Sequence, residues 1–415
     1  MLDKSNKIIE NEGTNSTDLF TFKIELQKEL HKLLNFWSTE VIDEKYGGFL
    51  GKINHFGQKF PKSSKGIILN TRILWTFSAA YRTSKIERYK AIADISYQYL
   101  NKHFLDTKNG GVFWEVDYRG EPINKRKQAY AQSFAIYAYA EYYRVTKNKE
   151  SLYNAKSLYK VLEVKFWDVQ HSGYVEAFAE NWNQIEDMRL SEKDLNAPKS
   201  MNTHLHILEA YSNLYRVWPN KTLKKSIADL LGIFKEKIID ENSGHFNLFF
   251  DMDWKIRSEA ISFGHNIEGA WLLHEAAIVI NDKQCIEKNK KIALKLVDIT
   301  LNEGFDTDGS LFNEYENNKL DKEKHWWSQA EAMVGLMDAY EIDPKPTYLR
   351  SIFKLWNFIQ DYLIDSVNGE WFWRIDGTGK IIETDDKVGF WKCPYHNSRA
   401  LMELIERINN LNHDK

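Results

Sequence analysis

Three histidines of this chain, His206, His265 and His396, have the residue type and placement that proton-transfer chemistry needs. Histidine is the side chain whose ordinary pKa lets it accept and donate protons near neutral pH. Two histidines from different helices can face each other across a pocket. Such a pair suits a reaction that removes a proton from one face of a carbon and returns a proton to the opposite face.

These histidines belong to a larger set of residues that recurs at the starts of predicted helices. The set is Arg72, Tyr130, Asn202 with His206, His265 with Glu268, Trp327 with Glu331, and His396. Helix starts normally collect small capping residues and acids. Taken singly, each residue here has an ordinary interpretation as a cap, half of an ion pair or core. Together, once per repeat, they predict a shared pocket.

The chemistry of that pocket follows from the residue types. An enediolate formed by deprotonation next to an aldehyde needs a cation or hydrogen-bond donors to stabilise it, and Arg72 is the candidate. The indole faces of Trp327 and Trp391 can stack on the apolar face of a pyranose.

A metal or cofactor is not expected in this pocket. His204 lies two residues before His206, on nearly the opposite face of a helix, so the two side chains diverge. No His-Glu-x-x-His or Cys-x-x-Cys pattern accompanies them. We therefore expect no metal ion and no cofactor.

A repeated glycine phrase indicates how these residues are positioned. A turn segment, a glycine and an aromatic or apolar run recur six times, and the glycines at 48, 111, 173, 244, 309 and 369 are spaced by 63, 62, 71, 65 and 60 residues. Each phrase predicts a turn leading into a short strand, with glycine supplying a positive φ.

Two helical stretches with apolar residues at three- and four-residue spacing separate consecutive phrases. We expect helices near residues 20–40, 66–82, 86–104, 127–146, 150–166, 199–217, 221–239, 263–281, 285–302, 325–341, 345–363 and 394–410. Six helical hairpins favour an all-α fold, the (α/α)6 toroid, with inner and outer rings of six helices. An open helical solenoid is the alternative. In the toroid, the helix after each phrase is an inner helix, and the short strands gather at one mouth.

Composition limits the class of protein. The chain has 415 residues, 43% hydrophobic and 28% charged, with a net charge of −3 and no basic block, so a nucleic-acid or anionic membrane partner is not expected. Two distant cysteines, Cys285 and Cys393, fit a reducing compartment. Residues 1–18 are polar and are expected to be disordered or loosely ordered, with residues 19–415 forming one catalytic domain. Without a secretory signal or a membrane span, we expect a cytoplasmic protein.

Four motifs resemble those of cellobiose 2-epimerases, within the larger N-acylglucosamine 2-epimerase family. They are residues 199–206 (KSMNTHLH), 262–268 (SFGHNIE), 326–331 (WWSQAE) and 389–396 (GFWKCPYH). The resemblance runs from about residue 25 to 408 and itself implies the (α/α)6 fold. One departure is Ser328, where family members usually have proline; it bears on local rigidity and substrate fit more than on chemistry.

The resemblance implies an activity. It is reversible epimerisation at C2 of the reducing-end sugar of a β-1,4-linked disaccharide, such as cellobiose to glucosyl-mannose or lactose to epilactose. The ring opens, C2 is deprotonated to an enediolate, and the opposite face is reprotonated.

The resemblance also implies a role for each site residue. His265 and His396 match the acid/base pair, His206 the ring-opening histidine, and Arg72 the arginine on the enediolate oxygens. Tyr130, Asn202, Glu268, Trp327 and Trp391 match residues that hold the reducing-end sugar, and Asp194 matches an acid placed near the second sugar. Glu331, beside Trp327, is expected among the substrate-binding residues.

Three other functions remain open. A mannose/glucose 2-epimerase or aldose–ketose isomerase would share the histidines, although the long segment 181–200 favours a disaccharide. A glycoside hydrolase needs two carboxylates, for which Glu268, Glu331 or Asp194 could serve, but it leaves the histidines unexplained. A non-catalytic sugar- or protein-binding module is the third.

Overall fold

All twelve expected helices are present in the computed structural model, which describes residues 16–413. They are α1 (Ser16–Thr39), α2 (Ile67–Ser84), α3 (Glu87–His103), α4 (Ala129–Thr146), α5 (Lys149–Val161), α6 (Met201–Val217), α7 (Lys221–Ile233), α8 (Phe263–Ile280), α9 (Lys283–Glu303), α10 (Trp326–Ile342), α11 (Pro346–Phe358) and α12 (Tyr395–His413). Three outer helices, α5, α7 and α11, end in a π-helical turn that the sequence pattern did not predict: η1 (Leu162–Phe166), η2 (Phe234–Ile238) and η3 (Ile359–Leu363).

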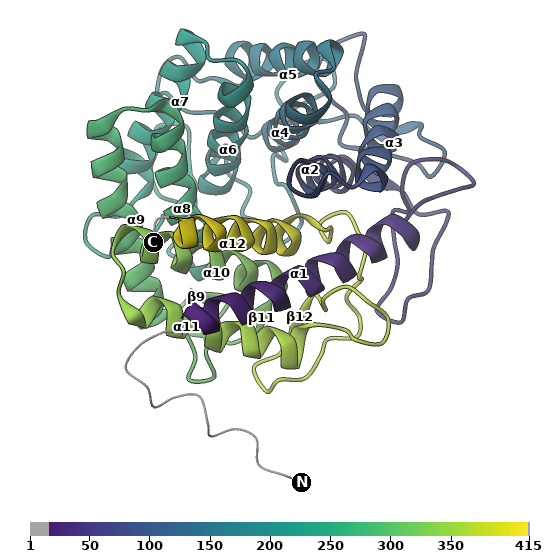
Figure 1. Cartoon of the computed structure of the whole chain (residues 1–415). Coiled ribbons are helices and arrows are strands. Elements are labelled where there is room, and N and C mark those ends of the chain that lie inside the picture. The colour runs from purple at the N-terminus through teal and green to yellow at the C-terminus, as the bar shows by residue number, and fades with distance from the viewer. Residues whose placement is uncertain (1–15, 414–415) are drawn as a thin grey trace.

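The even-numbered helices form a closed inner ring. Each packs against the next, from α2 through α4, α6, α8 and α10 to α12, and α12 packs back against α2 (Figure 1). The odd-numbered helices lie outside: α3, α5, α7, α9 and α11 each pack on the inner helix that precedes them in the chain, and α1 packs on α12. The molecule is therefore an (α/α)6 toroid, and the open solenoid is excluded by the contact between α12 and α2.

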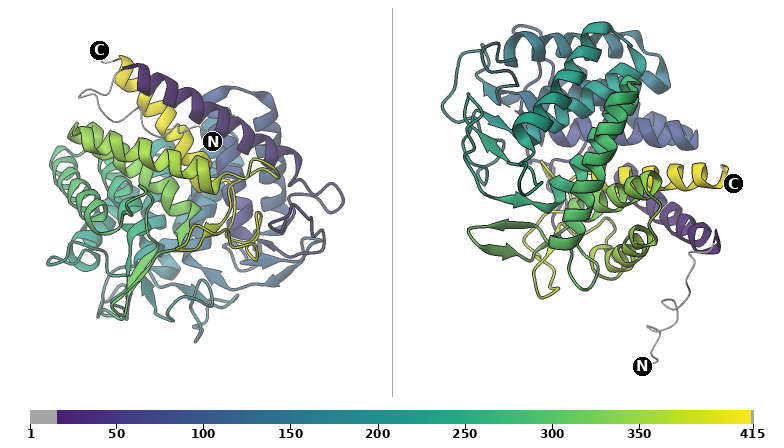
Figure 2. Two further views of the ribbon diagram at one scale, coloured as in Figure 1. Left: turned by 90° about the horizontal axis from the view of Figure 1, so that it is seen from below. Right: turned by 90° about the vertical axis from the view of Figure 1, so that its left-hand side faces the viewer.

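Short strands gather at one end of the toroid, opposite the C-terminal end of α12 (Figure 2). The strands are β1 (Lys65–Gly66), β2 (Glu115–Val116), β3 (Pro122–Asn124), β4 (Lys127–Gln128), β5 (Ala177–Phe178), β6 (Lys199–Ser200), β7 (Phe249–Phe250), β8 (Ile261–Ser262), β9 (Glu314–Glu316), β10 (Lys319–Asp321), β11 (Lys324–His325) and β12 (Arg374–Ile375). β1, β4, β6, β8 and β11 each run directly into an inner helix.

The strand pairing passes from each repeat to the next. β1 pairs with β2, β4 with β5, β6 with β7, β8 with β9 and β11 with β12, all antiparallel. A bridge between Ile53 and Val388 joins the last repeat to the first. The strand end is therefore closed in the same order as the inner helices, which fixes the N-termini of those helices relative to one another.

The glycine phrases have the predicted conformation. The six phrase glycines all have positive φ, between 66° at Gly48 and 90° at Gly309. An antiparallel bridge closes each turn, for example between Ile42 and Phe49 or between Leu105 and Val112. The prediction of a turn leading into a short strand is confirmed.

A buried lysine–aspartate ion pair recurs where the turns meet the inner helices. The pairs are Lys65–Asp43, Lys127–Asp106, Lys199–Asp168, Lys324–Asp306 and Lys387–Asp365. In four of them, one aspartate oxygen accepts two backbone N–H groups of the glycine turn, as Asp106 does from Lys108 and Asn109, and Asp306 accepts one, from Thr307. The other oxygen accepts from the lysine ammonium, at 2.7 Å in the Lys127 pair. Four of these pairs tie the end of an outer helix to the start of the next inner helix, and the fifth holds Lys387, eight residues before α12.

The fourth repeat departs from this pattern. Its turn aspartate, Asp240, still accepts N–H groups from Asn242 and Ser243, but the position equivalent to the lysines is Ile261. The N-terminus of α8 is therefore held without this ion pair.

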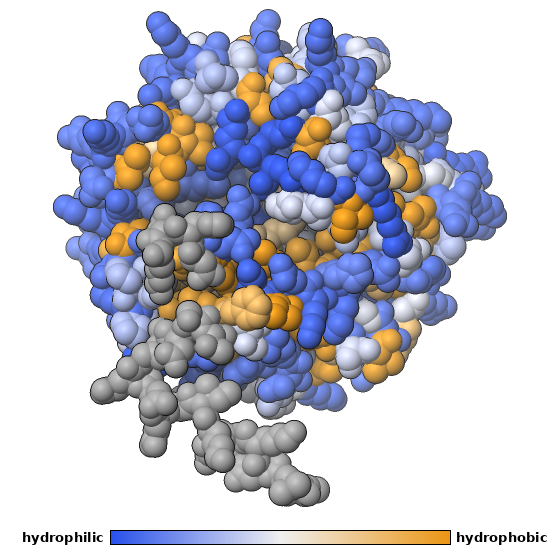
Figure 3. All heavy atoms as spheres, in the orientation of Figure 1, coloured by the Kyte–Doolittle hydropathy of each residue, from blue (hydrophilic) through white to orange (hydrophobic). Residues whose placement is uncertain are grey.

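The first helix begins earlier than expected. Ser16, Thr17 and Asp18, expected within the loosely ordered segment 1–18, form the first turn of α1, and residues 1–15 lie outside the described residues. Among residues 16–413, no helix has the length and apolar character to cross a membrane. The face opposite the strands is mostly hydrophilic, with hydrophobic side chains in separate small groups (Figure 3).

The buried ion pairs should contribute strongly to stability. Lys127 is fully buried and Asp106 is 3% exposed, so Lys127→Met would leave an uncompensated buried carboxylate. Breaking such a pair costs about 3–5 kcal/mol, which urea denaturation would detect. As a control, Lys225→Met breaks the exposed Lys225–Asp229 pair and should barely move the midpoint. Equal shifts in the two variants would contradict the clamping role of Lys127.

Candidate functional site

Six inner-helix residues share one depth in the toroid. Arg72, Phe134, His206, Glu268 and Glu331 are each the sixth residue of their helix, and Arg399 is the fifth residue of α12; we call these six residues the floor ring. Because the inner helices start from the same strand end, equal positions along them lie at equal depth. The cyclic order therefore places two arginines, two glutamates, a histidine and a phenylalanine around one centre.

Arg72 carries a buried positive charge that has no carboxylate partner among residues 16–413. Its guanidinium donates to the Tyr130 hydroxyl at 2.9 Å and contacts the Cys393 sulfur at 3.8 Å. It also lies over the rings of Phe134 and Tyr395, at 4.3 and 4.9 Å from their centroids. Nε has no hydrogen-bond partner in this part of the chain. A buried cation without a counter-ion is well placed for an anion that forms during a reaction.

Two of the candidate histidines are each oriented by a glutamate. Nδ1 of His206 lies 2.9 Å from Glu209, one turn further along α6, and Nδ1 of His396 lies 2.7 Å from Glu331 on α10. A carboxylate at Nδ1 keeps the proton there and leaves the Nε2 lone pair free to act as a base. Both histidines are almost fully buried.

His265 is held differently. Its Nδ1 lies 2.8 Å from the Ser262 hydroxyl, which can either donate or accept, so His265 can present Nε2 as an acid or as a base. Its ring packs on Trp327 at 4.7 Å, and Trp327 lies 5.7 Å from His396. His265 and His396 therefore flank the same indole.

Burial disfavours the charged form of all three histidines. Desolvation, with a smaller contribution from the nearby His206, lowers the pKa of His265 to about 3. Desolvation also lowers the pKa of His206, and lowers that of His396 well below its usual value, with Arg72 and Arg399 adding to the shift. The free protein therefore holds neutral histidines at neutral pH.

A pocket of about 860 Å³ leads outward from this cluster. His265, Trp327 and Asn202 line its inner part, and Asp194 and other residues of the segment 188–197 line one wall. Asp194 is half-buried, and one of its oxygens accepts from the backbone N–H and the hydroxyl of Ser191 at 2.8 and 2.9 Å. Asn202 Oδ1 is buried without a partner among the described residues.

Tyr130 and Trp391 form the aromatic side of the site. Their rings lie 5.8 Å apart, and Tyr130 packs edge-on against His206 at 5.0 Å. Trp391 lies in residues 388–394, between the strand bridge at Val388 and the start of α12, where the other repeats pass directly from strand to helix. The structure thus brings all of the sequence-predicted site residues into one region, with Asp194 in the outer wall.

Glu268 and Glu331 are joined by the second arginine of the floor ring, Arg399. One guanidinium nitrogen of Arg399 donates to Glu268 at 2.8 Å and to Glu331 at 2.6 Å. The other Glu331 oxygen accepts from the indole of Trp271 at 3.1 Å, so both its oxygens are engaged. Glu268 keeps one buried oxygen without a partner in the described chain.

The same glutamates, with His396, have the spacing of a possible metal site. Ligand atoms of Glu268, Glu331 and His396 lie within 4.8 Å of one another. Arg399 supplies positive charge at both carboxylates, and the expectation of a metal-free site stays a prediction.

Four residues of this cluster were not among the site residues predicted from the sequence: Glu209, Arg399, Phe134 and Tyr395. Phe134 and Arg399 could have been found by counting, because they occupy the floor-ring position of α4 and α12. Tyr395 lies between the two arginines, with Arg399 4.2 Å from its ring centroid, and donates a hydrogen bond to Glu209 across the ring. That contact joins α12 to α6 and has no signal in local sequence.

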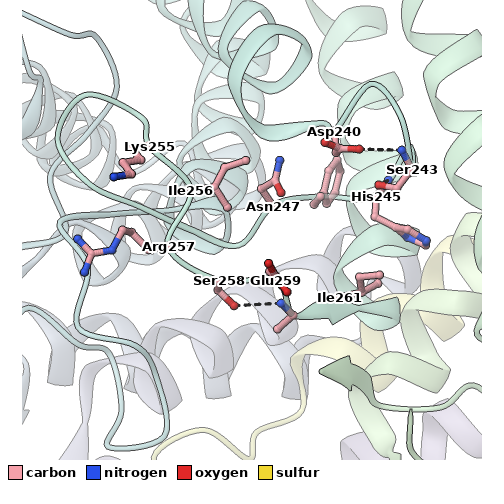
Figure 4. Close-up of a pocket in the computed structure, with 12 residues that line it drawn as sticks. Asp240, Ser243, His245, Asn247, Lys255, Ile256, Arg257, Ser258, Glu259 and Ile261 are labelled. Atoms are coloured by element: carbon pink, nitrogen blue, oxygen red, sulfur yellow. Dashed lines mark hydrogen bonds between the residues drawn. The ribbon is translucent and has the colours of Figure 1, made fainter. Parts of the chain in front are cut away.

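A second pocket, of about 630 Å³, lies beside the fourth repeat (Figure 4). Asp240, His245 and Ile261 line it, and the segment 257–260 separates it from the larger pocket. Both ring nitrogens of His245 are engaged, by Asn266 and by Glu303. None of the predicted site residues lies in it.

Comparison with known proteins agrees with this geometry. The family model described as N-acylglucosamine 2-epimerase (GlcNAc 2-epimerase) matches residues 48–400. A cellobiose 2-epimerase from Bacteroides fragilis is 45% identical over 388 residues, covering 92% of this chain and 98% of the relative. The structure of cellobiose 2-epimerase from Bacillus thermoamylovorans superimposes with a TM-score of 0.89 at 40% identity, covering 94% of this chain and all of that one.

A more distant relative, the D-mannose isomerase of Marinomonas mediterranea, is 24% identical over 407 residues, which cover 94% of this chain and 98% of that relative. With a family model that matches most of its length, this chain belongs to the N-acylglucosamine 2-epimerase family of carbohydrate epimerases.

Proposed function

We propose that this protein epimerises the reducing-end sugar of a β-1,4-linked disaccharide at C2, converting cellobiose to glucosyl-mannose and lactose to epilactose. The observation that carries the proposal is the pairing of neutral, buried histidines with Arg72, a buried guanidinium without a counter-ion. An enediolate is the anion that such a site accommodates, because its negative charge forms only when a histidine takes the C2 proton.

In the proposed mechanism, His206 assists opening of the sugar ring, and the open-chain aldehyde lies with its oxygens toward Arg72. One of His265 and His396 removes the C2 proton, and the other returns a proton to the opposite face. The shared contact of both histidines with Trp327 supports this arrangement. Tyr130, Asn202, Glu268, Trp327 and Trp391 hold the reducing-end sugar.

Glu331 takes a different role in the proposal from the one its position predicted. Because both of its oxygens are engaged by His396, Arg399 and Trp271, it orients His396 rather than binding a sugar hydroxyl. In the proposal, Asp194 contacts the second sugar, and its position in the pocket wall supports this role. We further propose that residues 19–415 act as one catalytic domain in the cytoplasm, without a metal, nucleic-acid or membrane partner.

The pocket of about 860 Å³ favours a disaccharide over a single sugar, because it extends from His265 outward to Asp194. An aldose–ketose isomerase remains the second candidate on the same chemistry, in keeping with the D-mannose isomerase relative. A glycoside hydrolase is disfavoured by geometry. Hydrolases place two carboxyl groups on either side of the scissile bond, whereas Glu268 and Glu331 lie side by side on one Arg399 nitrogen.

Product analysis tests the proposal directly. Cellobiose, lactose, mannose and N-acetylglucosamine are incubated with the protein in deuterated buffer containing EDTA. We expect the C2 epimers of the two disaccharides, with solvent deuterium at C2, because the returning proton comes from a second base. Release of glucose from cellobiose would instead indicate hydrolysis. Turnover of mannose alone would support the isomerase, and product without deuterium would indicate hydride transfer.

The two proposed acid/base histidines can be tested by substitution. His265→Asn and His396→Asn should each lower kcat for epimerisation by ~10²-fold or more, since general acid–base assistance typically contributes ~10²–10⁴-fold. His171→Asn is the control, because the His171 side chain is partly exposed and bonds only Asp168 among the described residues. Wild-type turnover in either site variant would remove that histidine from the mechanism.

The pH dependence follows from the direction of the pKa shifts. Because burial lowers the pKa of His265 and His396, both stay neutral as the pH falls through ~6.5, the usual imidazole value. The base form is therefore retained in mild acid, and the acid limb of kcat/KM should lie below pH 6. A limb centred at pH 6.5 would show that the histidines titrate as if exposed to water.

A further inference from the structure

Arg399 occupies the same ring position as Arg72 but has the opposite electrostatic surroundings. It is 1% exposed and forms ion pairs with three glutamates, Glu209, Glu268 and Glu331, on three different inner helices. Arg72, its neighbour around the ring, has none among residues 16–413. The ring of Tyr395 lies against both guanidinium groups.

Two of these three glutamates are hydrogen-bonded to a histidine that the proposed reaction uses. Glu209 receives Arg399 on one oxygen and Nδ1 of His206 on the other. Glu331 receives Arg399 and Nδ1 of His396 on the same oxygen. Arg399 therefore contacts the glutamate partners of both histidines, although His206 lies on α6 and His396 on α12.

The charges explain why a cation is needed at this position. Three buried carboxylates within reach of one another repel, and burying each without a partner is unfavourable because it loses its hydration. If Arg399 were neutral, the nearest uncommitted cation in the described site would be Arg72. Glutamates that turned toward Arg72 would move away from the histidines, and protonated glutamates would be weaker acceptors for Nδ1 than carboxylates are.

We propose that Arg399 is the positioning residue for this reaction. It fixes Glu209 and Glu331 so that His206 and His396 keep the proton on Nδ1 and direct Nε2 to the sugar, and it leaves Arg72 uncommitted for the substrate's oxyanion. The catalytic part of this inference rests on the proposed epimerase function; the effect on the histidine tautomers does not.

Two substitutions at Arg399 test the proposal, with matched changes at Arg407 as controls. Arg407 is a second arginine of α12, with a half-buried side chain, and pairs with Asp338, Glu341 and Glu403, outside the site. Arg399→Met should lower kcat for cellobiose epimerisation ~10²-fold or more, with KM changed only a few-fold. Arg399→Lys should recover part of that loss, because a point charge cannot replace the planar fork. Arg407→Met and Arg407→Lys should keep the wild-type kcat even if they lower the unfolding temperature.

Two further measurements separate positioning from simple stabilisation. Long-range ¹H–¹⁵N NMR of the histidine rings should show the Nδ1-protonated tautomer for His206 and His396 in wild type and its loss in Arg399→Met. The acid limb of kcat/KM should also move to higher pH in Arg399→Met, because Arg399 helps to lower the pKa of both histidines. The Arg407 variants should leave both the spectra and the pH profile unchanged.

Several outcomes would overturn the positioning role of Arg399. A folded Arg399→Met protein with wild-type kcat and unchanged histidine spectra would overturn it. If the methionine variant does not fold, Arg399→Lys and Glu209→Gln carry the test; the latter should alter the His206 signals and leave those of His396. Loss of kcat in the Arg407 variants equal to that at Arg399 would also overturn it. Wild-type inactivity on all four sugars would reject the proposed function alone, and the NMR comparison would still decide the role of Arg399.

Discussion

The buried ion pair between a turn aspartate and a pre-helix lysine is the interaction on which the site depends. In four repeats the pair joins the end of an outer helix directly to the start of an inner one, and the strand pairing carries the alignment around to α8 and α12. A helix advances about 1.5 Å per residue, so a fixed start fixes the depth of every later side chain. Floor-ring residues from six helices meet at one level because the helix starts do.

The floor ring concentrates charge where water is excluded, and its two arginines have different surroundings. Arg399 balances the glutamates that orient the histidines, whereas Arg72 is surrounded by aromatic rings and the Tyr130 hydroxyl. Desolvation keeps the histidines neutral, so they can accept a proton at ordinary pH. The resting site therefore holds both a base and an uncompensated cation, which is the combination that an enediolate intermediate requires.

Much of this arrangement was predictable from sequence, for physical reasons. Glycine at positive φ and the helical period of apolar residues are local signals, and they predicted twelve helices in their observed order. Unusual residues near the helix starts predicted His206, His265 and His396. Contacts across the ring are not local. The position of Arg399 could be counted, but its ion pairs with glutamates of three other helices could not, and the sequence places Glu331 among the sugar contacts because its partners on α8 and α12 have no local signal.

The missing lysine of the fourth repeat gives the ring a built-in mechanical asymmetry. Ile261 holds the start of α8 through strand pairing, and Asn266 bonds the turn at His245 and Phe246. A pocket rather than an ion pair lies beside Asp240. Local opening is easiest where few buried interactions hold a segment. The start of α8, the helix that carries His265, therefore lacks a buried interaction that the starts of α2, α4, α6 and α10 have. An enzyme that epimerises C2 must accept sugars with the C2 hydrogen on opposite faces, and a helix start held by one interaction fewer lets the His265 side of the pocket adjust to both.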